Sequence, residues 1–351
     1  MRPTLSVLIV AWESRDDLEK TLPALLPELD DGDELIVVEN KPGDGSADLV
    51  RELAPQARLV PTGRNTGFAG GANAGAEVAT GDLLVTLNPD AAPQPGWGEA
   101  IRRPWRQGRG WAAWQALVAD GAGKRINSAG NPIHFTGIVW AGGHGRPLAE
   151  AALAREVPAI SGACLAIPRV HWERIGGFPP EFFMYHEDVD ISVRLRMAGG
   201  TVGIESSAVV AHDYDFDASA DKWRWLERNR LAFLVRTYPP SLLALLAPAL
   251  LATELALLLV SAAGGWGPQK RQANREFLRW LPRLLAERRA IQRRRTVSAA
   301  EFASWLTPDL DSDLISPLVR SWPARLLLRT YWRLVRLLLS STGSSAGSES
   351  R

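Results

Sequence analysis

Cysteine is almost absent from this chain, since Cys164 is the only one among 351 residues. A single thiol excludes an internal disulfide and a cysteine-based zinc cluster, so the composition fits a reducing, cytosolic location with Cys164 in the core. The N-terminus also lacks the long apolar h-region and the small-residue cleavage site of a signal peptide. We therefore expect the chain to stay on the cytoplasmic side of any membrane that it touches.

Two common nucleotide-binding signatures are missing as well. No G-x-G-x-x-G follows the first expected strand, where residues 11–15 read Ala-Trp-Glu-Ser-Arg, and no G-K-[ST] occurs anywhere. These absences argue against a dinucleotide-dependent dehydrogenase and against a P-loop NTPase. A nucleotide could instead be held by carboxylates at strand ends and by backbone amides at a helix N-terminus.

The first ninety residues contain short apolar runs that alternate with amphipathic stretches. The pattern predicts strands over 5–11, 34–39, 58–60 and 82–87, and helices over 15–26, 46–53 and 70–79. Such alternation predicts right-handed βαβ units and a parallel sheet. The length allows one large domain with an appendage, or two domains.

The fourth apolar run ends abruptly at Asn88-Pro89-Asp90. Because Pro89 cannot donate to a sheet ladder, the chain leaves the sheet there and presents Asn88 and Asp90 at the rim, where open α/β sheets bind ligands. Asp beside Pro also fits an ordinary turn. The loop 64–73 is open to two interpretations in the same way, because it fits a phosphate-binding helix N-terminus and a plain Gly-rich connection.

Two adjacent carboxylates, Glu187 and Asp188, follow an aromatic run and open another expected helix. The helix dipole favours acidic residues in a first turn whatever their function. A carboxylate pair behind aromatic residues is also the arrangement that supplies a general base at a pocket wall. A later expected strand ends on His212, again at a sheet rim.

Seven segments occur in an order that matches a known family: SVLIV at 6–10; IVVEN with DGS at 36–46; NTGFA at 65–69 with Asn73 and Gly75; LNPD at 87–90; SGA at 161–163; IGGF at 175–178; and F-x-x-x-E-D-x-D-x-S-x-R at 183–194. In these segments the chain resembles the family 2 inverting glycosyltransferases of GT-A fold, in the branch of rhamnosyltransferase and galactofuranosyltransferase-like proteins. The resemblance covers about residues 4–235, and an ordered set of motifs makes coincidence unlikely.

The resemblance implies an α/β, GT-A nucleotide-diphospho-sugar transferase fold with a Rossmann-like, mostly parallel sheet. It implies a catalytic domain over 1–235, with a nucleotide-binding half over 1–95 and an acceptor half over 96–235. The implied reaction is the inverting transfer of rhamnose or a similar hexose from a nucleotide-diphosphate sugar to a hydroxyl of a cell-envelope or lipid-linked glycan.

Site residues carry over position by position. Asp188 matches the catalytic base, with Glu187 as its neighbour, while Asp90 and His212 match a site for Mg²⁺ or Mn²⁺, cations that suit oxygen and imidazole ligands. Donor binding is implied for Glu39, Arg64, Asn65, Asn73, Asn88 and Asp90. The chain departs from the family at Asn88, which replaces the first acid of the D-x-D-type motif, and at Glu39, which replaces an Asp that faces the nucleobase.

The C-terminal third is expected to be a helical, membrane-associating region over 236–339, followed by a disordered tail over 340–351. The apolar run 242–263 approaches the length of a membrane span, but Pro248 and Glu254 interrupt it, so an in-plane or hairpin insertion is equally open.

Residues 269–295 contain ten Lys or Arg against two Glu, and residues 326–339 are amphipathic and rich in Arg. These features favour an anionic membrane surface over nucleic acid as partner. The alternative is a helical bundle that packs on the catalytic domain or forms a homo-oligomer.

Three other functions are alternatives to a glycosyltransferase that acts on a lipid-linked or envelope acceptor. A nucleotidyltransferase shares strand-end acids but usually has a Gly-rich basic loop after its first strand, which Trp12-Glu13-Ser14 does not supply. A catalytically silent glycan-binding subunit would not need Asp90, Asp188 and His212 together. A transferase acting on a soluble or secondary-metabolite acceptor would need them equally.

Overall fold

The computed structural model describes residues 2–213, 221–311 and 321–345, which form two compact units. The first unit comprises Met1–Asn131, Ala141–Arg196 and Gly200–Ala218, and the second comprises Pro132–Trp140, Met197–Gly199 and Ser219–Arg351. We predicted the domain boundary after residue 235, yet α8 (Lys222–Thr237) belongs to the second unit. The reason is electrostatic in part, because Arg224 of α8 is ion-paired at 2.6 Å with Glu276 of α10 (Gly267–Arg293).

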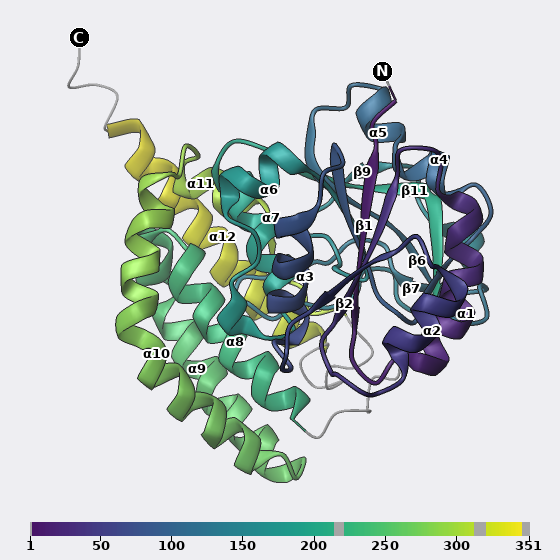
Figure 1. Cartoon of the computed structure of the whole chain (residues 1–351). Helices are drawn as coiled ribbons and strands as arrows, with labels where there is room; N and C mark the ends of the chain where they lie inside the picture. The colour runs from purple at the N-terminus through teal and green to yellow at the C-terminus, as the bar shows by residue number, and fades with distance from the viewer. Residues whose placement is uncertain (1, 214–220, 312–320, 346–351) are drawn as a thin grey trace. The chain divides into compact units, whose positions relative to one another are not determined.

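The first unit begins with the predicted βαβ units (Figure 1). The elements are β1 (Leu5–Ala11), α1 (Arg15–Leu25), β2 (Glu34–Glu39), α2 (Ser46–Leu53), β3 (Arg58–Pro61), α3 (Gly67–Val78) and β4 (Leu83–Leu87). The four strands are all parallel and lie in the order β3-β2-β1-β4. Because parallel strands end at the same edge, the polar residues after β1, β2 and β4 all lie at one rim of the sheet.

After β4 the first unit continues with parallel and antiparallel strands and with the helices between them. Its remaining elements are β5 (Ala91–Pro93), α4 (Trp97–Ile101), α5 (Arg103–Arg106), β6 (Trp111–Asp120), β7 (Ile126–Ser128), β9 (Arg155–Glu156), β10 (Cys164–Pro168), α6 (Arg169–Ile175), α7 (Glu187–Met197) and β11 (Thr201–His212). Strand β10 is antiparallel to both β4 and β6, and β11 is parallel to β6. The antiparallel β5 lies against the end of β11.

Residues 157–163 have the composition of a strand, but β10 begins only at Cys164. Three backbone N–H groups before it bond to side chains instead of a neighbouring strand. Ile160 donates to the Ser192 hydroxyl at 3.1 Å, and Ser161 to the Gln115 carboxamide at 2.8 Å. Gly162 donates to Asp188 at 3.0 Å. The backbone N–H groups of residues 160–162 therefore bind side chains and do not extend the strand.

Both faces of this sheet are covered by helices. Leucines of α1 and α2 pack with Trp97 of α4 on one face, and Ala69 and Ala72 of α3 pack with Ile191 of α7 on the other. Small residues in α3 allow a close approach, because an ideal Cβ on Gly71 would lie 2.5 Å from a methyl carbon of Val10. This burial on both faces explains why the first strands read as continuous apolar runs.

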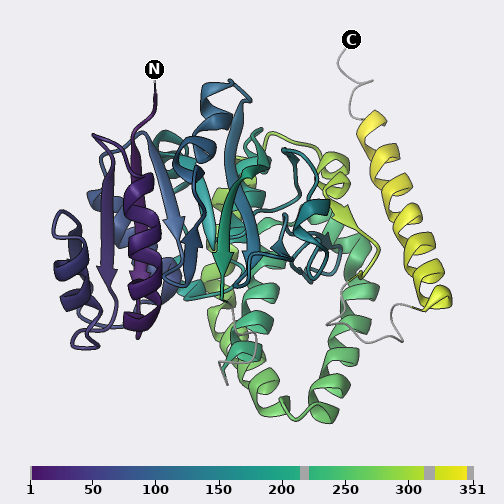
Figure 2. The same cartoon turned by 90° about the vertical axis from the view of Figure 1, so that its right-hand side faces the viewer.

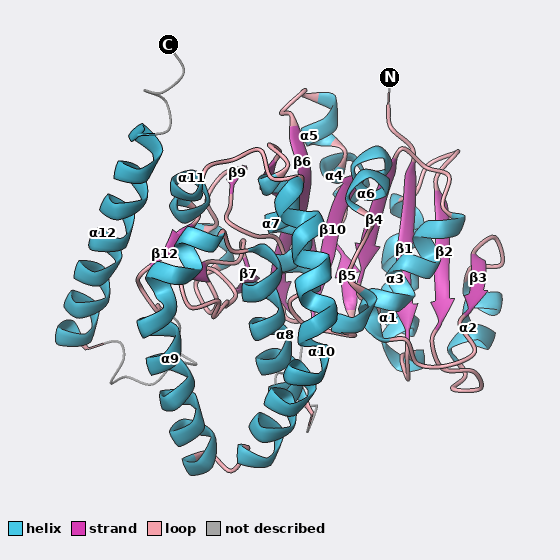
Figure 3. Ribbon diagram, turned by 90° about the vertical axis from the view of Figure 1, so that its left-hand side faces the viewer, coloured by secondary structure: helices cyan, strands magenta, loops and turns pink. Residues whose placement is uncertain are grey.

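The second unit is mainly helical. It contains β8 (Ile133–His134), α8, α9 (Pro240–Ala263), α10, α11 (Ala299–Ser304), β12 (Leu306–Thr307) and α12 (Trp322–Ser345). Helices α9 and α10 form an antiparallel hairpin through a short turn at 264–266 (Figure 2), and α8 lies along α10 (Figure 3). β12 is parallel to β8. The expected helical region is therefore present over most of 236–339.

The disordered tail predicted over 340–351 is wrong for its first residues, because α12 continues to Ser345. Leu339 is buried, and the hydroxyls of Ser340 and Ser341 donate to carbonyls three residues earlier at 2.8 and 2.9 Å. These local bonds let serine continue a helix. The rest of the predicted tail, 346–351, lies outside the described residues.

Candidate functional site

The predicted rim residues Asn88, Asp90 and His212 come together at the end of β4. His212 is the last residue of β11 and lies opposite Ala91 of β5, which places it beside the turn that follows β4. Its Nε2 lies 3.0 Å from Oδ1 of Asp90 and 3.3 Å from Nδ2 of Asn88. The sequence placed Asp90 and His212 each at a strand end, and the family resemblance implied that the two belong to one site.

These side chains can be tested against the divalent cation that the resemblance implies. In the described part of the chain, no three His, Cys, Asp or Glu side chains converge as a set that could hold a metal ion. Asp90 and His212 supply two ligands, and the carboxamide of Asn88 lies beside His212. Mg²⁺ is commonly bound by one or two carboxylates together with substrate phosphates. The residues therefore fit an open site that a diphosphate completes, rather than a closed protein cage.

Two more carboxylates, those of Asp17 and Asp213, lie near this turn, and the sequence pattern did not predict them. Burial, followed by the charge of Asp90, raises the pKa of Asp17 in α1, and Asp213 adds to the effect. The Asp213 N–H donates to the Asp90 carbonyl at 3.2 Å. Asp17 was missed because an acid in a first helical turn is ordinary. The added negative charge makes the rim more attractive to a cation.

Asp188 lies in the first turn of α7 and is held by two backbone donors. Its Oδ2 accepts from Gly162 N at 3.0 Å, and its Oδ1 accepts from Val189 N at 2.8 Å. Burial raises the pKa of Asp188, while these two hydrogen bonds oppose the rise. The result is an oriented carboxylate with a pKa above its usual value, which makes it a stronger base.

Glu187 has a different environment. It is buried, and its Oε2 has no hydrogen-bond partner among the described residues. Burial, then the charges of Asp188 and Asp190, raise the pKa of Glu187 well above its usual value. Glu187 therefore holds its proton more tightly than Asp188 does, and the pair avoids two full charges side by side.

The segment 161–163 links the two groups of acids. Gly162 donates its N–H to Asp188, and its carbonyl accepts from the Thr86 hydroxyl of β4 at 3.0 Å. The next carbonyl, of Ala163, accepts from Asn88 N at 2.9 Å. One short stretch of backbone therefore fixes both Asp188 and the Asn88-Pro89-Asp90 turn to the end of β4.

The remaining polar residues of the α7 motif act as scaffold. Arg194 bonds to Asp190, and its two terminal nitrogens donate to the carbonyls of Ile175 and Gly177 at 2.8 and 2.7 Å. Ser192 donates to the Asp188 carbonyl at 2.5 Å. These contacts fix α7 to the turn after α6, so they position Asp188 instead of facing a ligand.

The loop after β3 is organised by Asn40, which sequence reasoning did not single out as a site residue. Its buried carboxamide donates to Asn65 Oδ1 at 3.1 Å and accepts from Thr66 N at 2.9 Å. Asn65 in turn accepts from Gly67 N at 2.9 Å and so starts α3, three residues before the predicted helix. Arg64 is exposed in the same loop.

Glu39 and Asn73, both predicted to bind the donor, differ in whether the side chain already has hydrogen-bond partners within the chain. Glu39 ends β2 at the rim of the sheet and has a half-buried side chain. Asn73 instead uses both ends of its carboxamide on the backbone of Phe178, donating to its carbonyl at 2.9 Å and accepting from its N–H at 3.0 Å. Asn73 therefore holds the segment after α6 against α3, and we regard it as a positioning residue.

A strained segment precedes α7. Phe183, Tyr185 and His186 have φ values of 66°, 68° and 68°, which are rare for residues other than glycine. The carbonyl of Phe183 accepts from Ala69 N at 3.0 Å. An added Cβ on Gly67 would collide with that carbonyl and lie 2.6 Å from the Phe183 ring. The loop 64–67 and the segment that leads into α7 are therefore in direct contact. Backbone strain of this kind clusters at functional sites.

Comparison with known proteins identifies relatives of this arrangement. Residues 6–175 match the family described as Glycosyl transferase family 2. The chain is 28% identical over 236 residues to the N-acetylglucosaminyl-diphospho-decaprenol L-rhamnosyltransferase of Mycobacterium tuberculosis, a match that covers 60% of this chain and 76% of the relative. It is 25% identical over 215 residues to the low-salt glycan biosynthesis hexosyltransferase Agl10 of Haloferax volcanii, covering 58% and 65%.

Among solved structures, the chain is similar to that of GalNAc-T7 with UDP, GalNAc and Mn²⁺. The TM-score is 0.55 at 15% identity, and the match covers 78% of this chain and 54% of that one. The chain therefore spans about half the length of this structural relative. At this identity the likeness bears on the fold, and it agrees with the GT-A arrangement implied by the sequence.

Proposed function

Because the chain carries a family 2 glycosyltransferase domain over residues 6–175, we propose that it is an inverting transferase whose acceptor is a lipid-linked or cell-envelope glycan. The observation that carries the proposal is the segment 161–163, which joins Asp188 to the Asn88-Pro89-Asp90 turn. A base on one side and a diphosphate site on the other are what an inverting displacement requires.

In the proposed reaction, Asp188 accepts the proton of the acceptor hydroxyl. The hydroxyl oxygen then forms a bond to the anomeric carbon, and the bond from that carbon to the nucleoside diphosphate breaks on the opposite face. The hydrogen bonds from Gly162 and Val189 orient the carboxylate, and burial strengthens it as a base. Burial and the charge of Asp188 raise the pKa of Glu187, which favours the neutral form of Glu187 beside the base.

We assign the donor to the rim formed by Glu39, Arg64, Asn65, Asn88 and Asp90. Asp90 and His212, with Asn88, would hold a Mg²⁺ or Mn²⁺ ion, which would neutralise charge on the leaving diphosphate. The N-terminal turn of α3 lies at the same rim, where the N–H groups of Thr66 and Gly67 are already bonded to Asn40 and Asn65, so the polar side chains of the loop are the donor-binding groups that we propose.

The sugar and acceptor are proposed from the relatives. The mycobacterial relative is named for L-rhamnose and a decaprenol-linked acceptor, and the archaeal one for a glycan. These names support a rhamnose or similar hexose donor, and a polyprenyl-diphosphate-linked acceptor at the cytoplasmic face of a bacterial membrane. α9, which is long and apolar enough for a membrane, agrees with that location.

A donor screen followed by transfer tests this proposal. Thermal shifts are measured with dTDP-, UDP- and GDP-sugars, and the best donor is then incubated with polyprenyl-diphosphate-linked N-acetylglucosamine. We expect one added hexose on the lipid-linked sugar by mass spectrometry, with anomeric configuration opposite to that of the donor. Transfer only to soluble acceptors would reject the lipid-linked assignment, and retained configuration would reject the inverting mechanism.

A further inference from the structure

Helix α9 presents a large apolar surface that the second unit leaves uncovered. It is the one helix in the described ranges that is long and apolar enough to cross a membrane, and 6% of its most apolar stretch is buried. Its exposed side chains include Leu251, Leu255, Leu258, Leu259 and Val260, with Leu259 73% exposed. Surfaces of this kind mark protein or membrane contacts.

The inner side of the same helix is fixed by a cluster of four charges. Glu254 of α9 accepts from Lys270 of α10 at 2.8 Å, and Lys270 also bonds to Glu227 of α8 at 2.5 Å. Arg230 of α8 pairs with Glu227 at 3.0 Å and with Glu254. Two positive and two negative side chains therefore compensate one another, and Lys270 is fully buried.

The four charges restrict how α9 can associate with a membrane. A spanning α9 would have to separate Glu254 from both partners, or carry α8 and α10 with it into hydrocarbon. Unpaired charges at the centre of a bilayer are strongly unfavourable. The pairing of Glu254 therefore favours a helix that lies against lipid with its outer face only.

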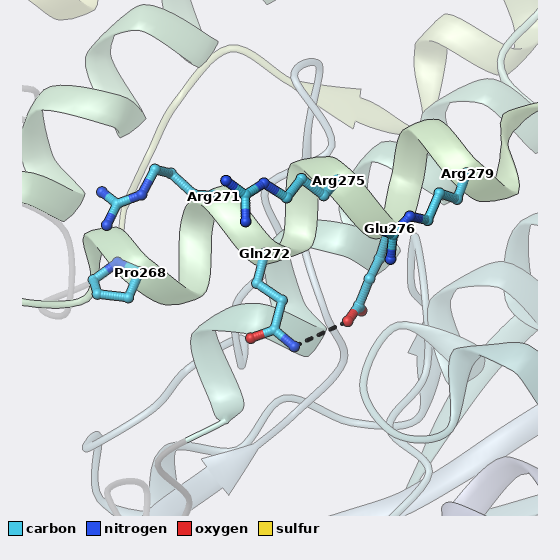
Figure 4. A pocket seen from close by; sticks show the side chains of 6 residues that line it. All are labelled: Pro268, Arg271, Gln272, Arg275, Glu276 and Arg279. Atoms are coloured by element: carbon cyan, nitrogen blue, oxygen red, sulfur yellow. Dashed lines mark hydrogen bonds between the residues drawn. The ribbon is translucent and has the colours of Figure 1, made fainter.

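An arginine row lies on the neighbouring helix. Arg271, Arg275 and Arg279 follow one another at intervals of four residues along α10, are exposed, and line an open pocket of about 450 Å³ (Figure 4). No hydrogen bond or ion pair within the described residues engages these three guanidinium groups. Glu276, the acid of the pocket, is instead paired with Arg224 at 2.6 Å. The row is free to bind anions.

An aromatic pair marks the turn between α9 and α10. Trp266 in this turn stacks on Trp223 of α8, with ring centroids 4.8 Å apart and planes 18° from parallel. Trp223 is 37% exposed. Tryptophan is enriched where protein meets the headgroup level of a bilayer. Leucine, arginine and tryptophan thus occur together on one helical hairpin.

We propose that the α9–α10 hairpin is a monotopic docking surface for an anionic phospholipid leaflet. The outer leucines of α9 enter the boundary of the acyl chains, and Arg271, Arg275 and Arg279 bind headgroup phosphates. A second copy of this chain is a poorer partner, because it would bring the same uncompensated arginines to the contact. The inference deepens the proposed function, since it names the surface by which the enzyme reaches a lipid-linked acceptor.

Vesicle flotation of the full-length protein tests the proposal. Vesicles of phosphatidylcholine alone are compared with vesicles containing about one third phosphatidylglycerol, and the wild type should prefer the anionic ones. The double variant Leu255→Glu, Leu259→Glu should lose at least tenfold in binding to both. The triple variant Arg271→Ser, Arg275→Ser, Arg279→Ser should lose the anionic preference. Leu153→Glu, at an 87% exposed leucine of the first unit, is the matched control and should bind as the wild type does.

A depth measurement separates docking from spanning. An environment-sensitive fluorophore on Ala252→Cys reports the outer face of α9, because Cys164 is fully buried and should not be labelled. Quenchers near the headgroups should quench it more strongly than quenchers at the bilayer centre. The reverse order would overturn the monotopic arrangement. Wild-type protein that ignores anionic vesicles, and a dimer that the leucine variant converts to monomers, would each overturn lipid as the partner. Sugar transfer to a detergent-dispersed acceptor is measured in parallel, so failure here is distinguishable from failure of the proposed reaction.

Discussion

Replacing Gly67 by alanine tests whether the loop 64–67 holds the segment that leads into α7 in place. Gly67 has φ +70°, and its added Cβ would lie 2.7 Å from the carbonyl carbon of Phe183. A matched control is Gly108→Ala, because Gly108 has φ +62° and nothing within 4 Å of an added Cβ. Both variants carry the strain of a left-handed residue, about 1 kcal/mol, but only Gly67→Ala must also move Phe183.

The magnitude follows from that difference. Overpacking costs about 1–3 kcal/mol, and displacing the Phe183 carbonyl weakens its bond from Ala69 N, about 1 kcal/mol. We therefore expect Gly108→Ala to lower the free energy of unfolding by about 1 kcal/mol and Gly67→Ala by about 3–5 kcal/mol. A shift of about 1 Å at a catalytic group can cost about 100-fold in rate, so kcat should fall to that extent in Gly67→Ala only.

Denaturant titration and steady-state transfer measure the two effects, with kcat taken at a temperature where both variants are folded. The reasoning is refuted if Gly67→Ala keeps kcat within about threefold of Gly108→Ala, a difference of less than about 0.7 kcal/mol in barrier. In that case the contact between Gly67 and Phe183 stabilises the fold without positioning Asp188.

Two further predictions concern the acids. Because burial raises the pKa of Glu187, the folded state binds the Glu187 proton more tightly than the unfolded state does, and this contribution to stability is lost as pH rises above the unfolded pKa of about 4.3. The variant Glu187→Gln should therefore gain stability over the wild type between pH 5 and pH 8, measured by urea titration. A stability difference that does not change with pH would contradict the raised pKa of Glu187. Asp90→Ala should weaken cation-dependent donor binding by about 100-fold and His212→Ala by about tenfold, because the first variant loses a charged ligand and the second a neutral one. Full transfer by the wild type in excess chelator would show that the reaction needs no divalent cation.

The parallel half of the sheet could be predicted because its strands are buried on both faces. Continuous apolar runs such as residues 83–87, with helical spacing between them, predicted β1 to β4 and their polarity. The strand pattern placed Asp90 and His212 each at a strand end, and the family resemblance implied their pairing, which the structure shows at 3.0 Å. Local pattern was sufficient in these cases because the elements are regular.

The remainder depends on contacts between residues far apart in the chain. Residues 157–163 have the composition of a strand, but the N–H groups of Ile160, Ser161 and Gly162 bond to side chains of β6 and α7. Asn73 was predicted to bind the donor, and nothing local indicates that Phe178 takes both ends of its carboxamide. The partner of Glu254 was equally hidden, because Lys270 follows sixteen residues later in another helix.

The role of Asp188 is the central claim, and the variant Asp188→Asn tests it most directly. Donor affinity is measured by calorimetry and transfer by single-turnover kinetics on the same preparation. We predict that kcat falls by at least about 1000-fold, about 4 kcal/mol of barrier, while the donor Kd changes less than about threefold, because the base acts on the acceptor. Transfer within about tenfold of the wild type would contradict the account and require another group to take the acceptor proton.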